Sequence, residues 1–309
     1  MDIDMIVKVI LAIVKTFFFF GIGALALRLK MFGSSDLGPL GRFAIDLLMP
    51  FFTFYSIVTN FGAGDAKALW QLPLLGFGIM LFGMLCGYGL QYGMRNRTPR
   101  RAATFIHLAT VNNYAFLPLI LLESLFGMKA VAYLFLMNVG SAIGFWTCGI
   151  FALVGGGDLK QTVRNILSTN IAAVALALLV VFTGIRVPGT AMSLCKDVGV
   201  IAVPLALILT GAAIFSSGSR LMAYRYDAIY TLLTRLVILP LLTIFVLKLF
   251  PLDPLTRDIS IVVSLMPASC ASALIVKKYG GCADLAGQSI FISTIASIVT
   301  IPVFLCFLM

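Results

Sequence analysis

The sequence predicts an all-α membrane protein of ten transmembrane helices, arranged as two inverted five-helix repeats in which helices four and nine are broken. Three observations support this fold class. The chain of 309 residues is 61% hydrophobic and 11% charged, whereas a soluble domain is roughly 45–50% apolar and about 25% charged. Ten apolar stretches each approach the length that crosses a bilayer. Prolines interrupt corresponding stretches in the two sets of five.

Each predicted helix contains about 20 mostly apolar residues, which is the length needed to cross the hydrocarbon core. The apolar runs are too long and too continuous for tilted barrel strands, which alternate over roughly ten residues. The predicted helices cover residues 5–27, 38–60, 70–93, 103–126, 130–154, 165–185, 192–214, 228–250, 257–277 and 285–308.

The glycine-rich stretch at 155–158 separates the two sets of five helices. We expect a first five-helix repeat over 1–154, a cytoplasmic linker over 155–164 and a second repeat over 165–309. Because five is odd, the second copy must insert upside down relative to the first, as in many secondary transporters. The pattern therefore indicates a carrier with its substrate site between the halves.

Basic residues are concentrated in the loops on one side of the predicted membrane helices. The net charge of +10 alone would suggest a nucleic-acid partner, but this distribution indicates membrane topology instead. Odd-numbered loops contain twelve of them and even-numbered loops five, which predicts a multi-pass protein of the cell membrane with its odd loops in the cytoplasm and both termini outside the cytoplasm. The twelve are Arg28, Lys30, Arg95, Arg97, Arg100, Arg101, Lys160, Arg164, Arg220, Arg225, Lys277 and Lys278, and the five are Lys67, Lys129, Arg186, Lys196 and Arg257.

Prolines near the middle of helices four and nine predict breaks in both. Each proline removes one backbone donor and frees the carbonyl four residues earlier, so that Pro118 frees Tyr114 and Pro267 frees Val263. Free carbonyls cannot face lipid and must be satisfied by a neighbouring helix, water or a bound cation. Matched breaks in the two halves indicate a binding site, whereas any single proline is equally consistent with a packing kink.

Helices two and seven are also expected to be broken at their middles, by Pro50 and Pro204. Pro50 frees the carbonyl of Asp46, whose side chain is four residues from Arg42 and on the same helix face. A carboxylate beside a bare carbonyl is a candidate proton or sodium site, so Asp46 and Pro50 are the candidate ion-coupling residues. A structural ion pair between Arg42 and Asp46 is the alternative.

The polar residues beside the breaks of helices four and nine are candidate substrate ligands. The amides of Asn112 and Asn113 suit a carboxylate, and the hydroxyls of Ser269 and Ser272 suit an oxyanion. Interhelical hydrogen bonds, worth roughly 0.6–2 kcal/mol, or helix caps are the alternatives. The candidate substrate-binding residues at the breaks are Asn112, Asn113, Tyr114, Pro118, Pro267, Ser269 and Ser272.

Charges within the predicted helices are candidates because each costs at least about 2.5–3.5 kcal/mol at the bilayer centre. Arg235 is expected to neutralise a substrate carboxylate or to pair with Asp46. Lys15 lies too deep to snorkel and must face the bundle interior or water. His107, the only histidine, suits a proton relay, although we expect a polar helix end. The six cysteines show no paired spacing, so neither a disulfide framework, a metal site nor a cofactor is expected.

Three segments resemble the auxin efflux carrier family: 113–118, 202–212 and the region from Met266 to Ala286. The resemblance spans nearly the whole chain and is greatest to the short prokaryotic members. It implies a ten-helix homodimeric carrier whose helices four and nine cross over and which moves organic acids such as malate, malonate or auxin. Ile120 and Tyr114 depart from the family pattern, which leaves the substrate open.

Three alternatives compete with a carrier of organic acids. The motif ending at Asp65 and the pair Tyr226-Asp227 match an intramembrane aspartyl protease, but the two carboxylates fall on opposite sides of the membrane. We therefore expect no enzyme. A sensor built on a carrier fold and a sodium-coupled bile-acid-type symporter both fit the same helices. Coupling to protons, to sodium or to neither stays open at this point.

Overall fold

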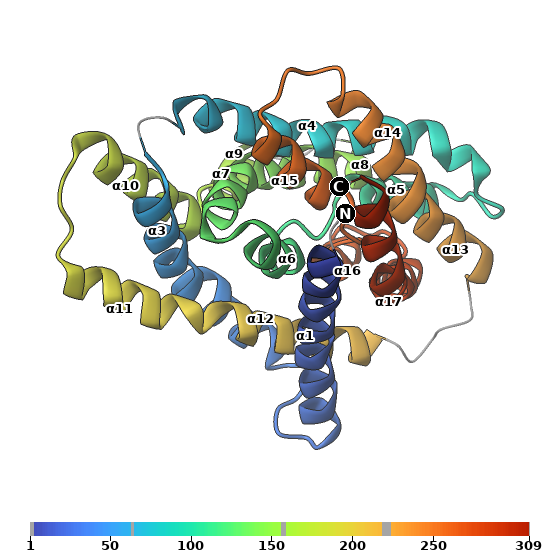
Figure 1. The fold of residues 1–309 in the computed structure, drawn as a ribbon. Helices are drawn as coiled ribbons and strands as arrows, with labels where there is room; N and C mark the ends of the chain where they lie inside the picture. Colours follow the sequence, from blue (N-terminus) through green and yellow to red (C-terminus); the bar gives the residue numbers. More distant parts are fainter. Residues whose placement is uncertain (1–2, 63–64, 156–158, 218–223, 309) are drawn as a thin grey trace.

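The chain folds almost entirely into helices (Figure 1). The computed structural model describes residues 3–62, 65–155, 159–217 and 224–308, and within these ranges the only β-structure is one isolated bridge. Gly64 of the protease-like motif, residues 156–158 of the predicted linker and Arg220 lie outside the described residues.

Seven helical stretches within the described residues are long and apolar enough to cross a membrane. They are Val7–Arg28, Leu37–Asn60, Ala68–Gly93, Met128–Val154, Gly189–Ser216, Arg225–Leu247 and Ala283–Phe307. Each coincides with a predicted helix to within a few residues, so these seven predictions are confirmed.

The rest of the apolar sequence forms shorter helices. These are α5 (Pro99–Thr110), α6 (Phe116–Phe126), α10 (Thr169–Thr183), α15 (Pro254–Ser264) and α16 (Ala271–Lys278). The second part of the predicted linker lies in helix α9 (Leu159–Ile166).

Several long stretches contain one turn of π-helix. The second predicted helix consists of α2 (Leu37–Arg42), the π-helical turn η1 (Phe43–Leu48) and α3 (Met49–Asn60). The expected break at Pro50 is therefore wrong, because the wider turn accommodates the missing donor while the helix continues. The helix expected to break at Pro204 pauses only at Ile201, which keeps right-handed helical angles between α11 (Gly189–Val200) and α12 (Ala202–Ser217).

Two other stretches have the same construction. One consists of α7 (Met128–Gly144), the π-helical turn η4 (Phe145–Gly149) and α8 (Ile150–Val154). The other consists of α13 (Arg225–Leu233), η6 (Thr234–Ile238) and α14 (Leu239–Leu247). π-Helical turns are frequent at functional sites, and both of these turns place a residue at the site described below.

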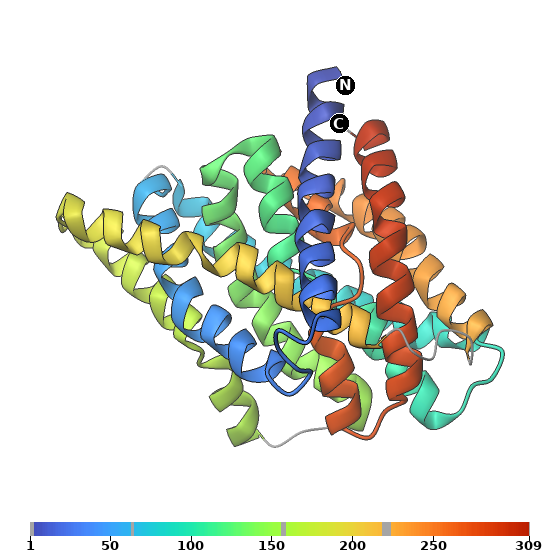
Figure 2. The ribbon, with the colours of Figure 1, turned by 90° about the horizontal axis from the view of Figure 1, so that it is seen from below.

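The helices pack as two groups. One group consists of α1 (Ile3–Arg28), α3, α10, α11 and α12, and the other is built around α4 (Ala66–Leu90), α5, α7 and the helices from α13 to α17 (Ala283–Leu308). Helix α6 packs against members of both groups, and α3 of the first group also packs against α7 of the second. Figure 2 shows the ends of α1 and α17 at one end of the molecule, so the two termini lie on the same side.

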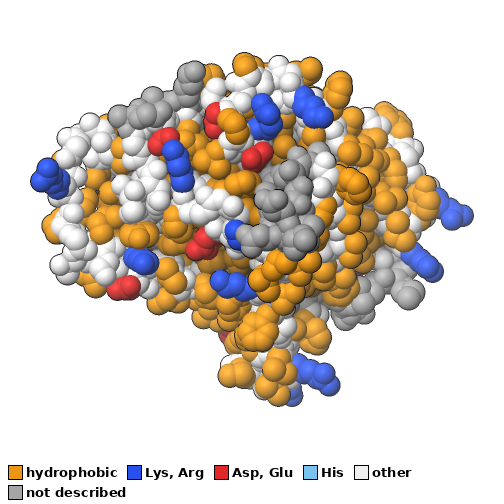
Figure 3. Space-filling model, in the orientation of Figure 1, with side chains coloured by type: hydrophobic (Ala, Val, Ile, Leu, Met, Phe, Trp, Pro, Cys, Tyr) orange, Lys and Arg blue, Asp and Glu red, His pale blue; other side chains and the backbone are white. Residues whose placement is uncertain are grey.

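Hydrophobic side chains cover much of the molecular surface (Figure 3). They include Leu11 and Phe18 of α1, Leu179 of α10 and Phe245 of α14, all more than half exposed. A surface of this kind is expected where lipid rather than water is the solvent.

Candidate functional site

The interruptions of two helices meet at one point. Helices α5 and α6 are separated by residues 111–115, and α15 and α16 by residues 265–270. Asn112 and Ala268, from the two interruptions, form an antiparallel bridge. Its hydrogen bonds run from the Asn113 N–H to the Pro267 carbonyl (2.8 Å) and from the Ser269 N–H to the Val111 carbonyl (3.2 Å). We call this junction the crossing, and it brings together residues that are about 155 positions apart in the chain.

The Asn112 side chain satisfies a carbonyl that proline leaves without its helical donor. Its Nδ2 donates to the Val263 oxygen at 2.7 Å, and Val263 is four residues before Pro267. The side chain is fully buried, and its Oδ1 has no hydrogen-bond partner among the described residues. One half of the amide therefore holds the two broken helices together, while the other half is an unused acceptor.

Arg235 extends from η6 and donates to three main-chain carbonyls at the crossing. Its Nε donates to Met266 (3.0 Å), its Nη1 to Ala109 (3.0 Å) and its Nη2 to Ser264 (3.1 Å). The side chain is 2% exposed. Ala109 and Ser264 lie at the C-terminal ends of α5 and α15, where the helix dipole is negative and favours a cation. The expected ion pair with Asp46 does not form among the described residues.

His107 lies on α5, and its two ring nitrogens join this helix to η4 and to α16. One ring nitrogen lies 2.7 Å from the Gly149 carbonyl in η4, and the other lies 3.0 Å from the Ser272 hydroxyl on α16. The ring is fully buried. The expectation of a polar helix end is therefore wrong. The signal available in the sequence was that an ionisable residue within an apolar helix is a functional candidate.

Two polar side chains at the crossing have no hydrogen-bond partner among the described residues. Those of Asn113 and Ser269 make no hydrogen bond within the described residues, and their residues are 8% and 9% exposed. Both follow the bridged pair on their own segments, just before the starts of α6 and α16. Successive side chains of extended chain point to opposite faces, so we expect this pair on the face away from Asn112. Each lies within three residues of the start of the following helix.

The remaining predicted residues divide by position. Tyr114 lies within the interruption, half-buried against the core, and Pro118 is buried as the third residue of α6. Lys15 is exposed on α1, a helix that contributes no residue to the crossing, so it does not face the bundle interior. Asp46 in η1 is also exposed, and it forms no ion pair with Arg42 among the described residues.

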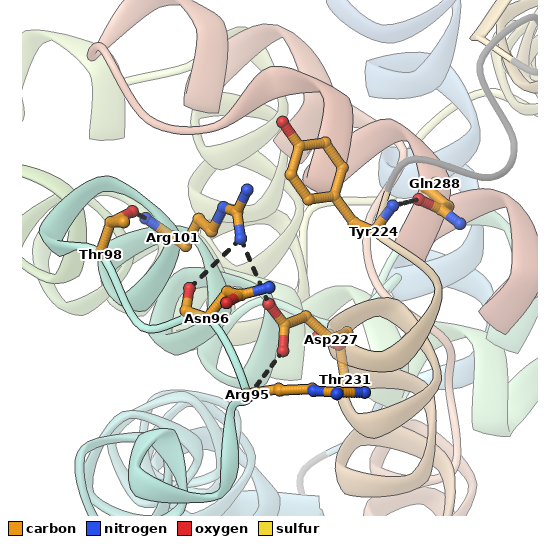
Figure 4. Close-up of polar contacts among 8 residues, drawn as sticks. All are labelled: Arg95, Asn96, Thr98, Arg101, Tyr224, Asp227, Thr231 and Gln288. Atoms are coloured by element: carbon orange, nitrogen blue, oxygen red, sulfur yellow. Dashed lines mark hydrogen bonds and ion pairs between the residues drawn. The ribbon is translucent and has the colours of Figure 1, made fainter.

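The two carboxylates of the protease-like motifs belong to separate networks. Figure 4 shows Arg101 of α5 reaching toward Asp227 at the start of α13, with the two side chains 3.8 Å apart. The Arg95 N–H donates to the same carboxylate at 2.9 Å. This network joins the loop before α5 to α13.

Asp65, in contrast, lies at the start of α4. It accepts hydrogen bonds from the Tyr133 hydroxyl (2.7 Å) and the Gly62 N–H (3.0 Å) and pairs with Lys129 (2.8 Å). Because each carboxylate has its own set of partners, the two do not share a proton as a protease dyad must.

A lipid-facing helical bundle with two broken helices that meet inside it defines a membrane transport protein. The family model for membrane transport proteins matches residues 8–162 and 158–305. The chain therefore belongs to the auxin efflux carrier family of membrane transporters, which confirms the resemblance and gives the protein a transported substrate and a lipid bilayer as surroundings. The family is not a known enzyme family. No curated protein matches the chain.

Proposed function

We propose that the protein is a secondary transporter that moves a small organic acid anion across the cell membrane by alternating access. The observation that supports this best is the distribution of charge at the crossing. Arg235 neutralises the C-terminal ends of α5 and α15, whereas the N-terminal ends of α6 and α16 carry no acidic residue in their first turns. The local field is therefore positive and favours an anion.

The groups available to hold that anion are the side-chain amide of Asn113 and the hydroxyl of Ser269. Asn112 has no donor left for it, because its Nδ2 already donates to Val263 and its Oδ1 is an acceptor. An amide donor and a hydroxyl donor beside two helix N-termini suit a carboxylate. In this proposal Tyr114, Pro118 and Pro267 shape the break. Ser272 contributes through the position of α16, because its hydroxyl already contacts His107.

The arrangement that we propose has ten transmembrane helices in two inverted five-helix repeats, over 1–154 and 165–309. Seven long helices, α10 and the two broken helices add up to ten. The two segments matched by the family model divide the chain at nearly the same place. The shared side of the termini and the distribution of basic residues support both ends lying outside the cytoplasm.

Alternating access would arise from movement of the group that contains the crossing against the group around α1, α3 and α12. The close approach of helices inside each group supports movement as two bodies. A Cβ at Gly211 of α12 would overlap Phe20 of α1, and a Cβ at Gly140 of α7 would overlap the Pro73 carbonyl oxygen of α4. The family resemblance supports a homodimer.

Uptake into proteoliposomes tests the function directly. The panel is malonate, malate, succinate, lactate and indole-acetate, and the variants are wild type, Asn113→Ala and the control Asn96→Ala in an exposed loop. We expect saturable uptake of one acid that is lost in Asn113→Ala and kept in Asn96→Ala. Equal uptake by all three proteins would exclude the crossing as the substrate site.

The coupling role that we propose for Asp46, beside Pro50, has its own test. Asp46→Asn should abolish accumulation driven by a pH gradient while leaving exchange of labelled acid, and Asp197→Asn, an exposed residue of α11, should change neither. Accumulation that persists in Asp46→Asn would exclude the role.

A further inference from the structure

We propose that Arg235 is a resident cation that occupies the place of a coupling sodium ion, so that the anion is carried without Na⁺. This inference rests on the proposed function. The observation behind it is that one guanidinium engages main-chain carbonyls from both broken helices, at 3.0–3.1 Å.

Transporters with broken helices bind Na⁺ through unwound carbonyls and the C-terminal ends of half-helices. Ala109 and Ser264 provide such ends here, and Met266 provides an unwound carbonyl directly before Pro267. All three oxygens accept from Arg235. A second cation in the same cradle would lose these ligands and would be repelled by a charge a few ångströms away.

The position of Arg235 depends on the local shape of its helix. It lies in the π-helical turn η6, and Pro240 follows as the second residue of α14. The wider turn changes the direction in which side chains leave the helix. Within the described residues Arg235 makes no ion pair, so its charge is balanced by carbonyl dipoles alone and the crossing keeps a net positive charge.

A guanidinium is permanently charged and covalently attached, unlike Na⁺. The crossing is then ready for an anion in every cycle, and no cation has to bind before the substrate. Arg235 also joins η6 to α5 and α15, so that these three segments move as one unit during transport.

Chemical rescue of an Arg235→Ala variant tests the cradle without any substrate. We expect the apparent Tm of the purified full-length protein to fall by roughly 5 °C or more, because three buried carbonyls lose their donors. Methylguanidinium, at concentrations far below those that denature proteins, should restore part of the loss by occupying the vacated cradle. Arg257→Ala, an exposed position on α15, is the matched control and should show neither the loss nor the rescue.

Sodium supplies the second part of the test. Wild type should have the same apparent Tm in sodium, potassium and choline chloride at equal ionic strength, whereas Na⁺ should stabilise Arg235→Ala relative to choline because the carbonyls are then free. Stabilisation of wild type by Na⁺, or a Tm of Arg235→Ala equal to that of wild type, would overturn the proposal.

If Arg235→Ala yields no folded protein, Arg235→Lys gives the same information. One ammonium can engage some of the carbonyls, so the Tm of Arg235→Lys should lie below that of wild type and should not respond to Na⁺. A Tm raised by Na⁺ would overturn the proposal.

A failure of the uptake panel would leave these Tm results intact, which separates a wrong substrate class from a wrong role for Arg235. Where uptake is found, wild type should transport equally when choline replaces Na⁺, and a requirement for Na⁺ contradicts the resident cation.

Discussion

The side chain of Asn112 donates a 2.7 Å hydrogen bond to the carbonyl of Val263. The two residues belong to different broken helices, and the carbonyl is the one that Pro267 leaves without its helical donor. Backbone groups inside a bilayer must find a partner within the protein. Asn112 therefore permits helix nine to break at this depth.

Asn112→Ala is expected to destabilise the fold by about 1–3 kcal/mol, because a buried carbonyl loses its strongest donor. Asn112→Asp should cost more, since it sets a carboxylate against the carbonyl oxygen. The apparent Tm in detergent measures both, with Asn96→Ala as the control from an exposed loop. A Tm of Asn112→Ala equal to that of the control would show that the bond contributes nothing.

Replacement of Ser269 and of Ser272, the two serines that follow Pro267, should have different effects on stability and transport. Ser272 is fully buried against His107, whereas the Ser269 side chain has no partner among the described residues. We expect Ser272→Ala to lower the Tm, and Ser269→Ala to leave the Tm unchanged while raising the KM for the transported acid. Loss of stability in Ser269→Ala with an unchanged KM would remove Ser269 from the proposed site.

The link between His107 and Ser272 can be measured with a double-mutant cycle. Because the ring and the hydroxyl are in direct contact across the two broken helices, His107→Ala and Ser272→Ala should be non-additive by about 0.5–3 kcal/mol. Additive losses in the double variant would mean that the contact does not couple α5 to α16.

The helices and their breaks at the crossing were predictable because apolar length and proline act locally. Pro118 and Pro267 each marked a real interruption. Pro50 did not, because a π-helical turn accommodated the missing donor. The residues around each proline do not distinguish these two outcomes, since a break depends on a partner from elsewhere in the chain, as Asn112 is for Val263.

The partners of the buried charges were not predictable. The sequence identified Arg235 as an intramembrane charge and suggested a carboxylate partner, but the structure gives it main-chain carbonyls, which every segment contains and no motif marks. The buried position of His107 was not predictable for a related reason. Its partner Ser272 is 165 residues away, and only the crossing of two helices brings them together.

Glycines at the contact between α4 and α7 give a prediction about packing. A Cβ at Gly140 would overlap the Pro73 carbonyl oxygen, whereas a Cβ at Gly78 of α4 meets nothing within 4 Å. Gly140→Ala should therefore force the helices apart and lower the Tm. Gly78→Ala should raise the Tm slightly, since alanine favours helix by roughly 0.5–1 kcal/mol over glycine. The opposite order of the two Tm values would exclude close approach at Gly140.

The carboxylate of Asp65, at the start of α4, predicts a dependence of stability on pH. Burial raises its pKa, but the hydrogen bonds from Lys129, Tyr133 and Gly62 outweigh burial and hold the pKa below its ordinary value of 3.8. A lowered pKa in the folded state stabilises the fold above the unfolded pKa, and this stabilisation is lost as the pH falls through the folded pKa.

The Tm difference between wild type and Asp65→Asn should accordingly be largest near about pH 7 and shrink below about pH 4. Lys129→Met removes the closest charge, at 2.8 Å, so the pH-dependent part of the difference should be smaller when measured in that background. Scans of apparent Tm against pH for the four proteins provide the measurement. A difference that grows as the pH falls would mean that the pKa of Asp65 is raised in the folded state, and that burial of the carboxylate outweighs its hydrogen bonds.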